Sequence, residues 1–217
     1  MRQFTSFALA ACAVALLVLA GCATNPPYDY TQFRTHSPRS ILVLPPLNES
    51  TEIQATYSYL STVTAPLAER GYYVFPVEVV DQFLKENGMP TPGEMHQVPL
   101  MKAAEIFGAD ALLFVQLKAY GSKYQLLSST TTVSVTARLV DTRTGALLWN
   151  GDADVQRGSN GSGNLIADLV AAAIVQIINS KTDPAHQVSR LANEMMFNKK
   201  NAALPYGPYS PKAGSFE

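Results

Sequence analysis

The chain has 217 residues and a formal net charge of −1 at pH 7, and 15% of its residues are charged. A nearly neutral balance provides no basic face for nucleic acid and no polybasic surface for lipid head groups, so neither is expected as a partner through charge. The length suits one sizeable hydrophobic core, and we expect a single domain.

The first 21 residues have the three parts of a secretory signal. Arg2 supplies a positive start, residues 7–20 are almost entirely apolar, and Ala20 and Gly21 directly precede Cys22. The apolar run is shorter than the roughly 20 residues of a membrane-spanning helix, and no basic stop-transfer cluster follows it. Small residues before a cysteine are typical of a bacterial lipobox. We therefore expect residues 1–21 to be removed and Cys22 to be the lipid attachment site.

An acylated Cys22 would anchor the protein to a membrane. One acyl chain holds a protein reversibly, because each buried methylene contributes roughly 0.8 kcal/mol, whereas two or three chains such as palmitate hold it stably. Ala23 follows the cysteine, and an Asp at that position retains many lipoproteins in the inner membrane. The sequence thus predicts the outer membrane, with the domain in the periplasm or at the cell surface. The alternative is a plain signal peptide with a cysteine nearby by chance.

Residues 22–39 are rich in proline and polar residues, without a helical or strand period, so an extended tether is expected there. The domain is expected over residues 40–200, and a tail rich in Pro and Tyr over 201–217. Cys12 lies in the removed segment, so no thiol remains for a disulfide and the domain must be held by core burial.

Strands and helices alternate in the first half of the domain. The aliphatic run at residues 41–44 is typical of a central strand buried on both faces, and residues 72–75 predict a second strand. Between them, a spacing of three and four predicts a helix over 54–70. Its expected inner face is Ile53, Tyr57, Leu60, Thr64 and Leu67. A strand, helix and strand of this length imply parallel pairing.

A helix follows Pro76, with Val77, Val80 and Leu84 inward and Asp81 among the side chains facing water. Residues 87–98 are expected to be a loop, 99–107 a helix and 111–115 a strand.

From residue 130 the period changes to two, which predicts a strand with one covered and one polar face. A turn over residues 141–145 leads to an antiparallel return strand from residue 146. The expected fold class is α/β (α+β), with a mixed sheet of about five strands flanked by helices.

Residues 165–178 form a predicted helix that is apolar on two faces. It either packs beneath the predicted helix 184–197 or is covered by another subunit, since large apolar patches are rare on monomers.

Two segments carry a resemblance to known proteins. The first is Gly108-Ala109-Asp110-Ala111-Leu112-Leu113, and the second runs from residue 133 through Asp141-Thr142-Arg143-Thr144-Gly145 to Trp149. They resemble periplasmic domains similar to the N-terminal domain of TolB and to the curli-secretion lipoprotein CsgG. With the lipobox, the chain resembles a family of bacterial lipoproteins of unknown function, best known from a meningococcal surface lipoprotein studied as a vaccine candidate.

This resemblance implies a TolB-like domain, a homodimer, and association with a CsgG-like envelope lipoprotein in transport or secretion. It implies no catalytic residue. The chain has nothing like the long membrane-inserting hairpins of a CsgG pore, so it is not expected to form the channel itself.

Chemical motifs are few. His36, His96 and His186 stand apart from each other, so no metal site is expected. The glycine-rich residues 158–163 could cradle a phosphate, but they lack the ending of a P-loop, and a capped turn explains them more simply. Asp152 and Asp154 share one face of a strand and are interpreted as a solvated edge. We expect no catalytic residue and no cofactor.

The proline-rich residues 204–211 are expected either to dock in a groove as an extended segment or to be a disordered terminus. The leading hypothesis is an outer-membrane-anchored, non-enzymatic accessory or assembly subunit of an envelope transport system. The alternative is a ligand-binding or hydrolytic envelope lipoprotein that uses the loop at residues 87–98 and the turn at Gly161 as a pocket.

Overall fold

A computed structural model describes residues 28–124, 129–158 and 183–215 of the chain. They form a six-stranded mixed sheet in the order β3-β1-β4-β5-β6, with β2 paired to β4 beside this path. The strands are β1 (Ser40–Val43), β2 (Leu47–Asn48), β3 (Tyr73–Val74), β4 (Ala111–Tyr124), β5 (Ser129–Asp141) and β6 (Leu147–Gly158). The described helices are α2 (Thr31–His36), α3 (Ala55–Glu69), α4 (Val77–Glu86), α5 (Pro92–Met95), α6 (Leu100–Phe107) and α8 (Pro184–Phe197).

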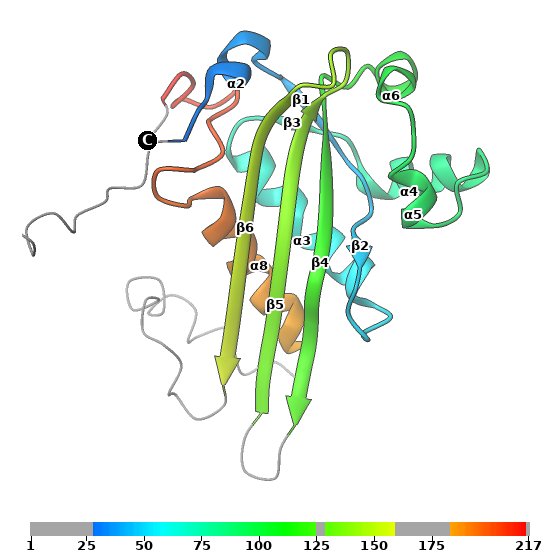
Figure 1. Cartoon of the computed structure of the whole chain (residues 1–217), viewed down its shortest axis with the longest axis vertical. Helices are drawn as coiled ribbons and strands as arrows, with labels where there is room; N and C mark the ends of the chain where they lie inside the picture. The colour runs from blue at the N-terminus through cyan, green and yellow to red at the C-terminus, as the bar shows by residue number, and fades with distance from the viewer. Residues whose placement is uncertain (1–27, 125–128, 159–182, 216–217) are drawn as a thin grey trace, which may run out of the picture.

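The predicted mixed sheet flanked by helices is confirmed (Figure 1). β1 pairs in parallel with β3 and β4, whereas β4, β5 and β6 pair antiparallel. The sixth strand is β2, a two-residue parallel pairing with β4 at Leu47 and Asn48. Two residues carry no periodicity, so the sequence pattern could not predict this strand.

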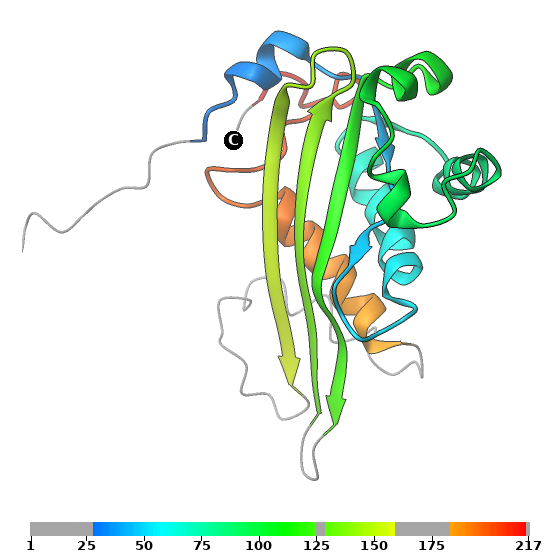
Figure 2. The same cartoon turned by 45° about the vertical axis from the view of Figure 1, so that its right-hand side comes forward.

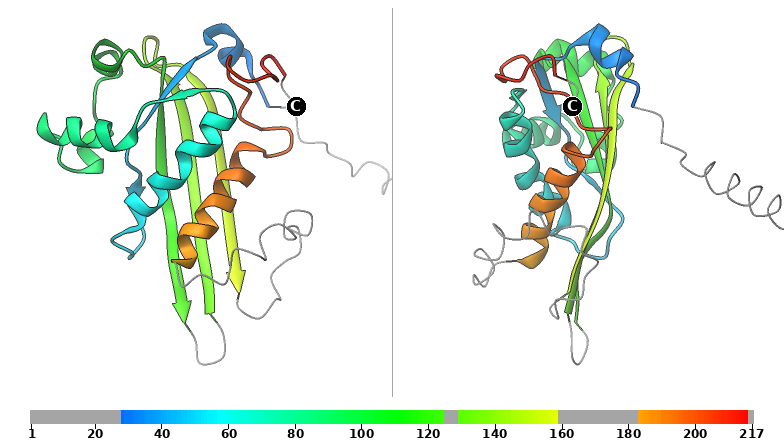
Figure 3. Two further views of the ribbon diagram at one scale, coloured as in Figure 1. Left: turned by 180° about the vertical axis from the view of Figure 1, so that it is seen from behind. Right: turned by 90° about the vertical axis from the view of Figure 1, so that its left-hand side faces the viewer.

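The helices cover the two faces of the sheet unequally (Figures 2 and 3). α3 and α8 pack on one face, where Ile41, Leu113, Val135 and Trp149 belong to the larger core cluster. α4, α5 and α6 cover the other face only beside β1 and the start of β4, with Leu42 in their cluster. The second face of β5 and β6 therefore has no described helix over it.

The strand β4 is longer than predicted. β4 continues past the apolar run at residues 111–115, because from Gln116 onward its side chains alternate between the core and the polar face. Its pairing with β5 shifts between Leu117 and Ala119, which marks a β-bulge at Lys118. An apolar run therefore marked only the half of β4 that is covered on both faces.

The predicted inner face of the helix over residues 54–70 is partly wrong. Ile53 is 90% exposed and Tyr57 is 46% exposed, whereas Tyr59 and Val63 are fully buried. Tyr59 is buried because its hydroxyl donates to the side-chain oxygen of Asn193 on α8, and Asn193 donates to Thr62 in turn. Because these polar residues bond each other, they can face the core. The spacing of apolar residues alone therefore predicted the wrong inner face for this helix.

Asp81 is also buried, although the pattern placed it toward water. Its carboxylate accepts from Lys85 at 2.6 Å and from the Tyr57 hydroxyl at 3.4 Å. Because groups on α3 and α4 bond this carboxylate, it is not buried as an unpaired charge.

The extended tether predicted for residues 22–39 is wrong for its second half. Residues 31–36 form α2, Tyr30 is 8% exposed and Phe33 is 5% exposed. The Tyr30 hydroxyl donates to the Ala203 carbonyl at 2.6 Å. Two aromatic side chains three residues apart suffice to dock one helical turn on the core, although the surrounding sequence is polar.

The C-terminal segment, residues 203–211, is docked, as one of the two alternatives predicted. The buried Arg70 guanidinium donates to the carbonyl of Leu204, and the Tyr72 hydroxyl donates to the carbonyl of Pro205 at 2.5 Å. The backbone of Gly207 donates to the Arg70 carbonyl at 2.8 Å. The segment thus crosses the C-terminal end of α3 and is held by bonds from buried groups.

The two segments that carry the resemblance form a polar clamp at one end of the sheet. The Asp110 carboxylate accepts from the backbone of Arg39 at 3.0 Å and from the Arg143 guanidinium at 3.0 Å. The fully buried Thr142 donates to the Ala109 carbonyl at 2.6 Å. The motif therefore joins the start of β1, the start of β4 and the β5–β6 turn, which is a structural role.

Replacing Gly207 with alanine is expected to release the C-terminal segment. An added Cβ would overlap the carbonyl oxygen of Gly71, a backbone atom that cannot turn away. Overpacking of this kind costs roughly 1–3 kcal/mol of unfolding free energy, measurable by urea denaturation. Gly158→Ala is the matched control, because its Cβ would meet no atom within 4 Å, and it should change stability by less than about 0.5 kcal/mol. Equal stability of both variants would contradict the docking.

Asp141 is expected to contribute to stability at neutral pH but not in acid. Burial raises the pKa of its carboxyl, but bonds from Thr144 and the Arg143 backbone outweigh this effect and hold the pKa below its usual value. Since the folded pKa is depressed, the stabilisation is full above the unfolded pKa of about 3.9 and is lost as pH falls through the folded value.

Unfolding free energy measured from pH 7 to pH 3 should therefore fall less steeply in Asp141→Asn than in the parent chain. Asp154→Asn, at an exposed position of β6, serves as the comparison and should retain the parent slope. An unchanged acid slope in Asp141→Asn would show that the turn does not depend on this charge.

Candidate functional site

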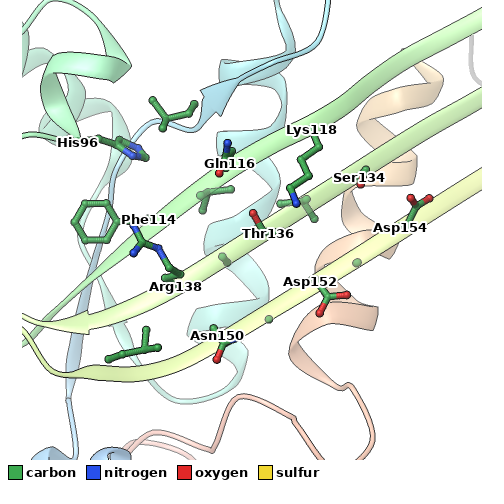
Figure 4. A pocket seen from close by; sticks show the side chains of 17 residues that line it. His96, Phe114, Gln116, Lys118, Ser134, Thr136, Arg138, Asn150, Asp152 and Asp154 are labelled. Carbon is green, nitrogen blue, oxygen red and sulfur yellow. The ribbon is translucent and has the colours of Figure 1, made fainter.

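The candidate site is the face of β4, β5 and β6 that no described helix covers, which we call the open face. Figure 4 shows side chains from all three strands that project from this face into one shallow groove, whose volume is about 700 Å³. Strand alternation places them there, because each second residue points away from α3 and α8. Its polar members are His96, Gln116, Lys118, Ser134, Thr136, Arg138, Asn150, Asp152 and Asp154.

The two charge signs lie on different strands of this face. Lys118 comes from β4 and Arg138 from β5, whereas Asp152 and Asp154 come from β6. The register places Thr136 opposite Asp152, with Arg138 next along β5. Both aspartates are exposed, and Asp152 accepts from Lys199 at 2.7 Å. The interpretation of these two residues as a solvated edge is confirmed.

One end of the groove is aromatic. The rings of His96 and Phe114 meet edge-on with centroids 5.4 Å apart, and the Arg138 guanidinium lies 5.6 Å from the Phe114 centroid. His96 Nε2 donates to the Pro45 carbonyl at 2.9 Å. Burial lowers the pKa of His96, so its neutral form is favoured. The residues at this end can offer stacking and a cation, but no strong base.

His96 comes from the segment that the sequence indicated as a loop. Residues 92–95 within it form α5, which begins with a capping box: the Thr91 hydroxyl accepts from the Glu94 backbone at 3.3 Å, and Glu94 accepts from the Thr91 backbone at 2.9 Å. This short helix fixes His96 at the groove.

A second polar cluster lies between α3, α8 and β4, on the covered face. Ser58 Oγ lies 3.4 Å from His186 Nδ1 and 3.2 Å from an oxygen of Asp183, and the Tyr120 hydroxyl donates to Ser58 at 2.6 Å. In a serine nucleophile the carboxylate orients the histidine, whereas here Asp183 contacts the serine and caps α8 through the Ala185 backbone at 3.0 Å. The arrangement is that of a helix cap.

The histidines do not come together. His36 Nδ1 lies 2.8 Å from the Gln32 carbonyl oxygen on α2, His96 lies at the groove and His186 lies on α8. Within residues 28–124, 129–158 and 183–215, no group of three His, Cys, Asp or Glu residues could hold a metal. The same residues include no helix long and apolar enough to cross a bilayer.

Several predicted features lie outside the described residues. These are Cys22, the glycine-rich turn beyond residue 158, and the helix predicted over residues 165–178. The structure therefore tests neither lipid attachment nor the two alternatives for that helix.

Sequence reasoning missed the groove itself. The alternation along β5 indicated a polar face, but Phe114 and Val115 belong to an apolar run, and His96 is 18 residues distant from Phe114 in sequence. Only the position of α5 beside β4 brings His96 and Phe114 together. The signal that could have found Arg138 is its place among the outward positions of the alternating strand.

The sequence matches the profile of a family described as "Putative lipoprotein GNA1162-like" over residues 28–209. A lipoprotein of Neisseria meningitidis serogroup B, strain MC58, is 47% identical over 181 residues, which are 82% of this chain and 84% of the relative. The crystal structure of lipoprotein GNA1162 from Neisseria meningitidis aligns with 66% of this chain and 100% of that chain, at 49% identity and a TM-score of 0.55.

A more distant likeness is to the PelC dodecamer from Paraburkholderia phytofirmans. It covers 84% of this chain and 96% of that chain, at 14% identity and a TM-score of 0.48, a level that supports no inference about function. The resemblance to TolB and CsgG stays a prediction, whereas the resemblance to the lipoprotein family is confirmed. From the profile match and the 47% identity together, the chain belongs to the GNA1162-like lipoprotein family.

Proposed function

We propose that this protein is an outer-membrane-anchored accessory subunit of an envelope transport or secretion assembly, and that it binds its protein partner with the uncovered face of β4, β5 and β6. The observation that carries the proposal is the open polar groove with both charge signs on separate strands. A shallow surface of this kind suits a protein, because small-molecule sites are concave and enclose most of their ligand.

Charge separation across the face favours a specific partner over non-specific adsorption. Lys118 and Arg138 meet acidic groups, while Asp152 and Asp154 on the neighbouring strand meet basic ones, so the register of a partner is fixed by complementarity. Arg138 beside Phe114 adds the residue types that dominate interface energetics. A homodimer and a CsgG-like envelope lipoprotein are the partners that the sequence resemblance favours.

The proposal does not include catalysis. In the described parts of the chain, the Asp183 carboxylate beside Ser58 caps α8 through the Ala185 backbone and does not orient a histidine. Catalysis needs a base and a nucleophile that converge on a reacting atom. The second candidate, a ligand-binding lipoprotein, is favoured by one feature only, the aromatic end of the groove at His96 and Phe114.

Cys22→Ser is expected to abolish membrane attachment. Serine cannot form the thioether, so the chain should appear as an unprocessed precursor and lose its acyl mass, measured by cell fractionation and mass spectrometry. Cys12→Ser is the matched control, because Cys12 lies in the removed segment and its loss should leave processing unchanged. Unaltered processing and fractionation of Cys22→Ser would overturn the anchoring.

Charge reversal on the open face is expected to weaken partner binding. Arg138→Glu should reduce the yield of crosslinked envelope complexes roughly 5-fold or more, since a reversed charge in an interface costs 1 kcal/mol or more. Arg190→Glu, an exposed arginine on α8, is the control and should keep the parent yield. The thermal midpoints of both variants must match the parent. Equal yields from the two variants would contradict the assignment of this face.

A further inference from the structure

The chain is fixed to the fold from Tyr28 onward. The Tyr28 backbone donates to the Asn201 carbonyl at 3.3 Å, and its hydroxyl accepts from the Asn150 backbone at 2.9 Å and donates to the Asn150 side chain at 2.8 Å. These bonds join the start of the described chain to β6 and to the loop after α8.

Only five residues separate Cys22 from Tyr28. A fully extended chain spans at most about 3.6 Å per residue, so the α-carbons of Cys22 and Tyr28 can be no more than about 22 Å apart. Eight residues of β6 lie beyond Asn150, ending at Gly158, and they extend about 27 Å at 3.4 Å per residue. With the Gly158 end toward the membrane, the length of β6 beyond Asn150 would exceed this reach, so the short tether favours the opposite orientation.

The end of the domain near Tyr28 has side chains that suit a bilayer surface. Arg34, Lys200 and Lys212 are exposed there, and Tyr209 is 68% exposed. Long basic side chains bury their methylenes and keep the charge among head groups, and tyrosine prefers the same layer. Basic side chains near an anionic leaflet are attracted to its head groups. Exposed carboxylates also lie near this end, among them Asp29, Glu69 and Asp152, and Asp152 accepts from Lys199 at 2.7 Å.

Three segments build this end, which we name the anchor end: α2, the turn between β5 and β6, and residues 199–212. Thr144 Oγ1 lies 3.1 Å from His36 Nε2, which joins the turn to α2. Lys212 lies 5.3 Å from the centroid of Tyr206, whose ring also stacks under Arg70. Figure 3 shows α2 and the C-terminal segment at the same end of the sheet.

We propose that the anchor end rests on a lipid surface with phosphate head groups, and that β4, β5 and β6 extend away from it. The open face then stands off the membrane plane and stays accessible to a partner. This inference rests on the proposed function only for the presence of lipid at Cys22. The near-neutral charge of the whole chain does not indicate this lipid contact, because a net charge does not describe where basic side chains lie on the surface.

Lysine reactivity on vesicles tests the orientation. The chain from Cys22 to Glu217 has a single thiol, which is coupled to a maleimide lipid in phosphatidylcholine vesicles with and without phosphatidylglycerol. This chain is the form that signal cleavage is expected to leave, so the experiment uses the mature protein. A water-soluble acetylating ester then labels lysines, and mass spectrometry measures the rate at each site.

Lys200 and Lys212 are expected to react several-fold more slowly on both kinds of vesicle than in the uncoupled chain. Lys118 and Lys123, both exposed on β4, should keep their free rates. Equal slowing at all four lysines, or slowing at Lys118 and Lys123 alone, would overturn the orientation. Because the chemical link replaces acylation, failure of acylation in cells would leave this result unaffected.

A longer tether distinguishes two causes of lysine protection: the short reach of the tether, and contact of the anchor end with lipid head groups. A twenty-residue Gly/Ser insertion after Thr24 should abolish the protection of Lys200 on phosphatidylcholine and retain part of it on phosphatidylglycerol. In the lengthened chain, the double variant Lys200→Glu, Lys212→Glu should lose the protection that remains on phosphatidylglycerol. The acetylation rate of Lys199 measures this loss. No difference between the two vesicle types in the lengthened chain would overturn the headgroup contact.

Discussion

The alternation of side chains along β5 and β6 decides both the packing and the exposed surface of this protein. Val133, Val135 and Leu139 point toward α3 and α8 and are almost fully buried, while the residues between them point the opposite way. A shift of one residue in register would exchange these two sets and place polar side chains in the core. The buried face therefore fixes the register, and the fixed register in turn presents the polar groove.

Much of the fold could be predicted from the sequence because its long elements carry clear periods. β5 alternates over its length, and α4 and α6 follow amphipathic spacing. The failures have a common cause. Tyr59 and Phe33 are buried against other elements, and Asp81 is buried with a partner on α3 besides Lys85 of its own helix, which a local apolar pattern cannot show. β2 and α5 are too short to carry a period.

The candidate site was less predictable than the fold. The polar face was indicated by alternation, but the groove arises where α5 brings His96 against Phe114. The residues of the sequence resemblance proved to be structural, since Asp110 and Thr142 clamp the β5–β6 turn to the start of the sheet. Such a clamp explains why a motif can specify this fold and carry no chemistry.

The chain enters the fold at one end of the groove. The Tyr28 hydroxyl contacts Asn150, which lines the groove, and the groove extends along the strands from there. A short tether limits how far the domain can move from the bilayer, and a rigid sheet holds the open face at a defined height. The short tether and the rigid sheet both restrict the open face before a partner arrives, which lowers the entropic cost of binding.

Hydroxyl-radical footprinting of the protein in native envelopes, compared with the purified chain, tests whether a partner binds the open face. His96 and Phe114 in the groove should become protected in envelopes, while Tyr57, which is 46% exposed on α3, should stay reactive. Unchanged reactivity of His96 and Phe114 together with protection of Tyr57 would show that a partner binds the helical face and not the groove.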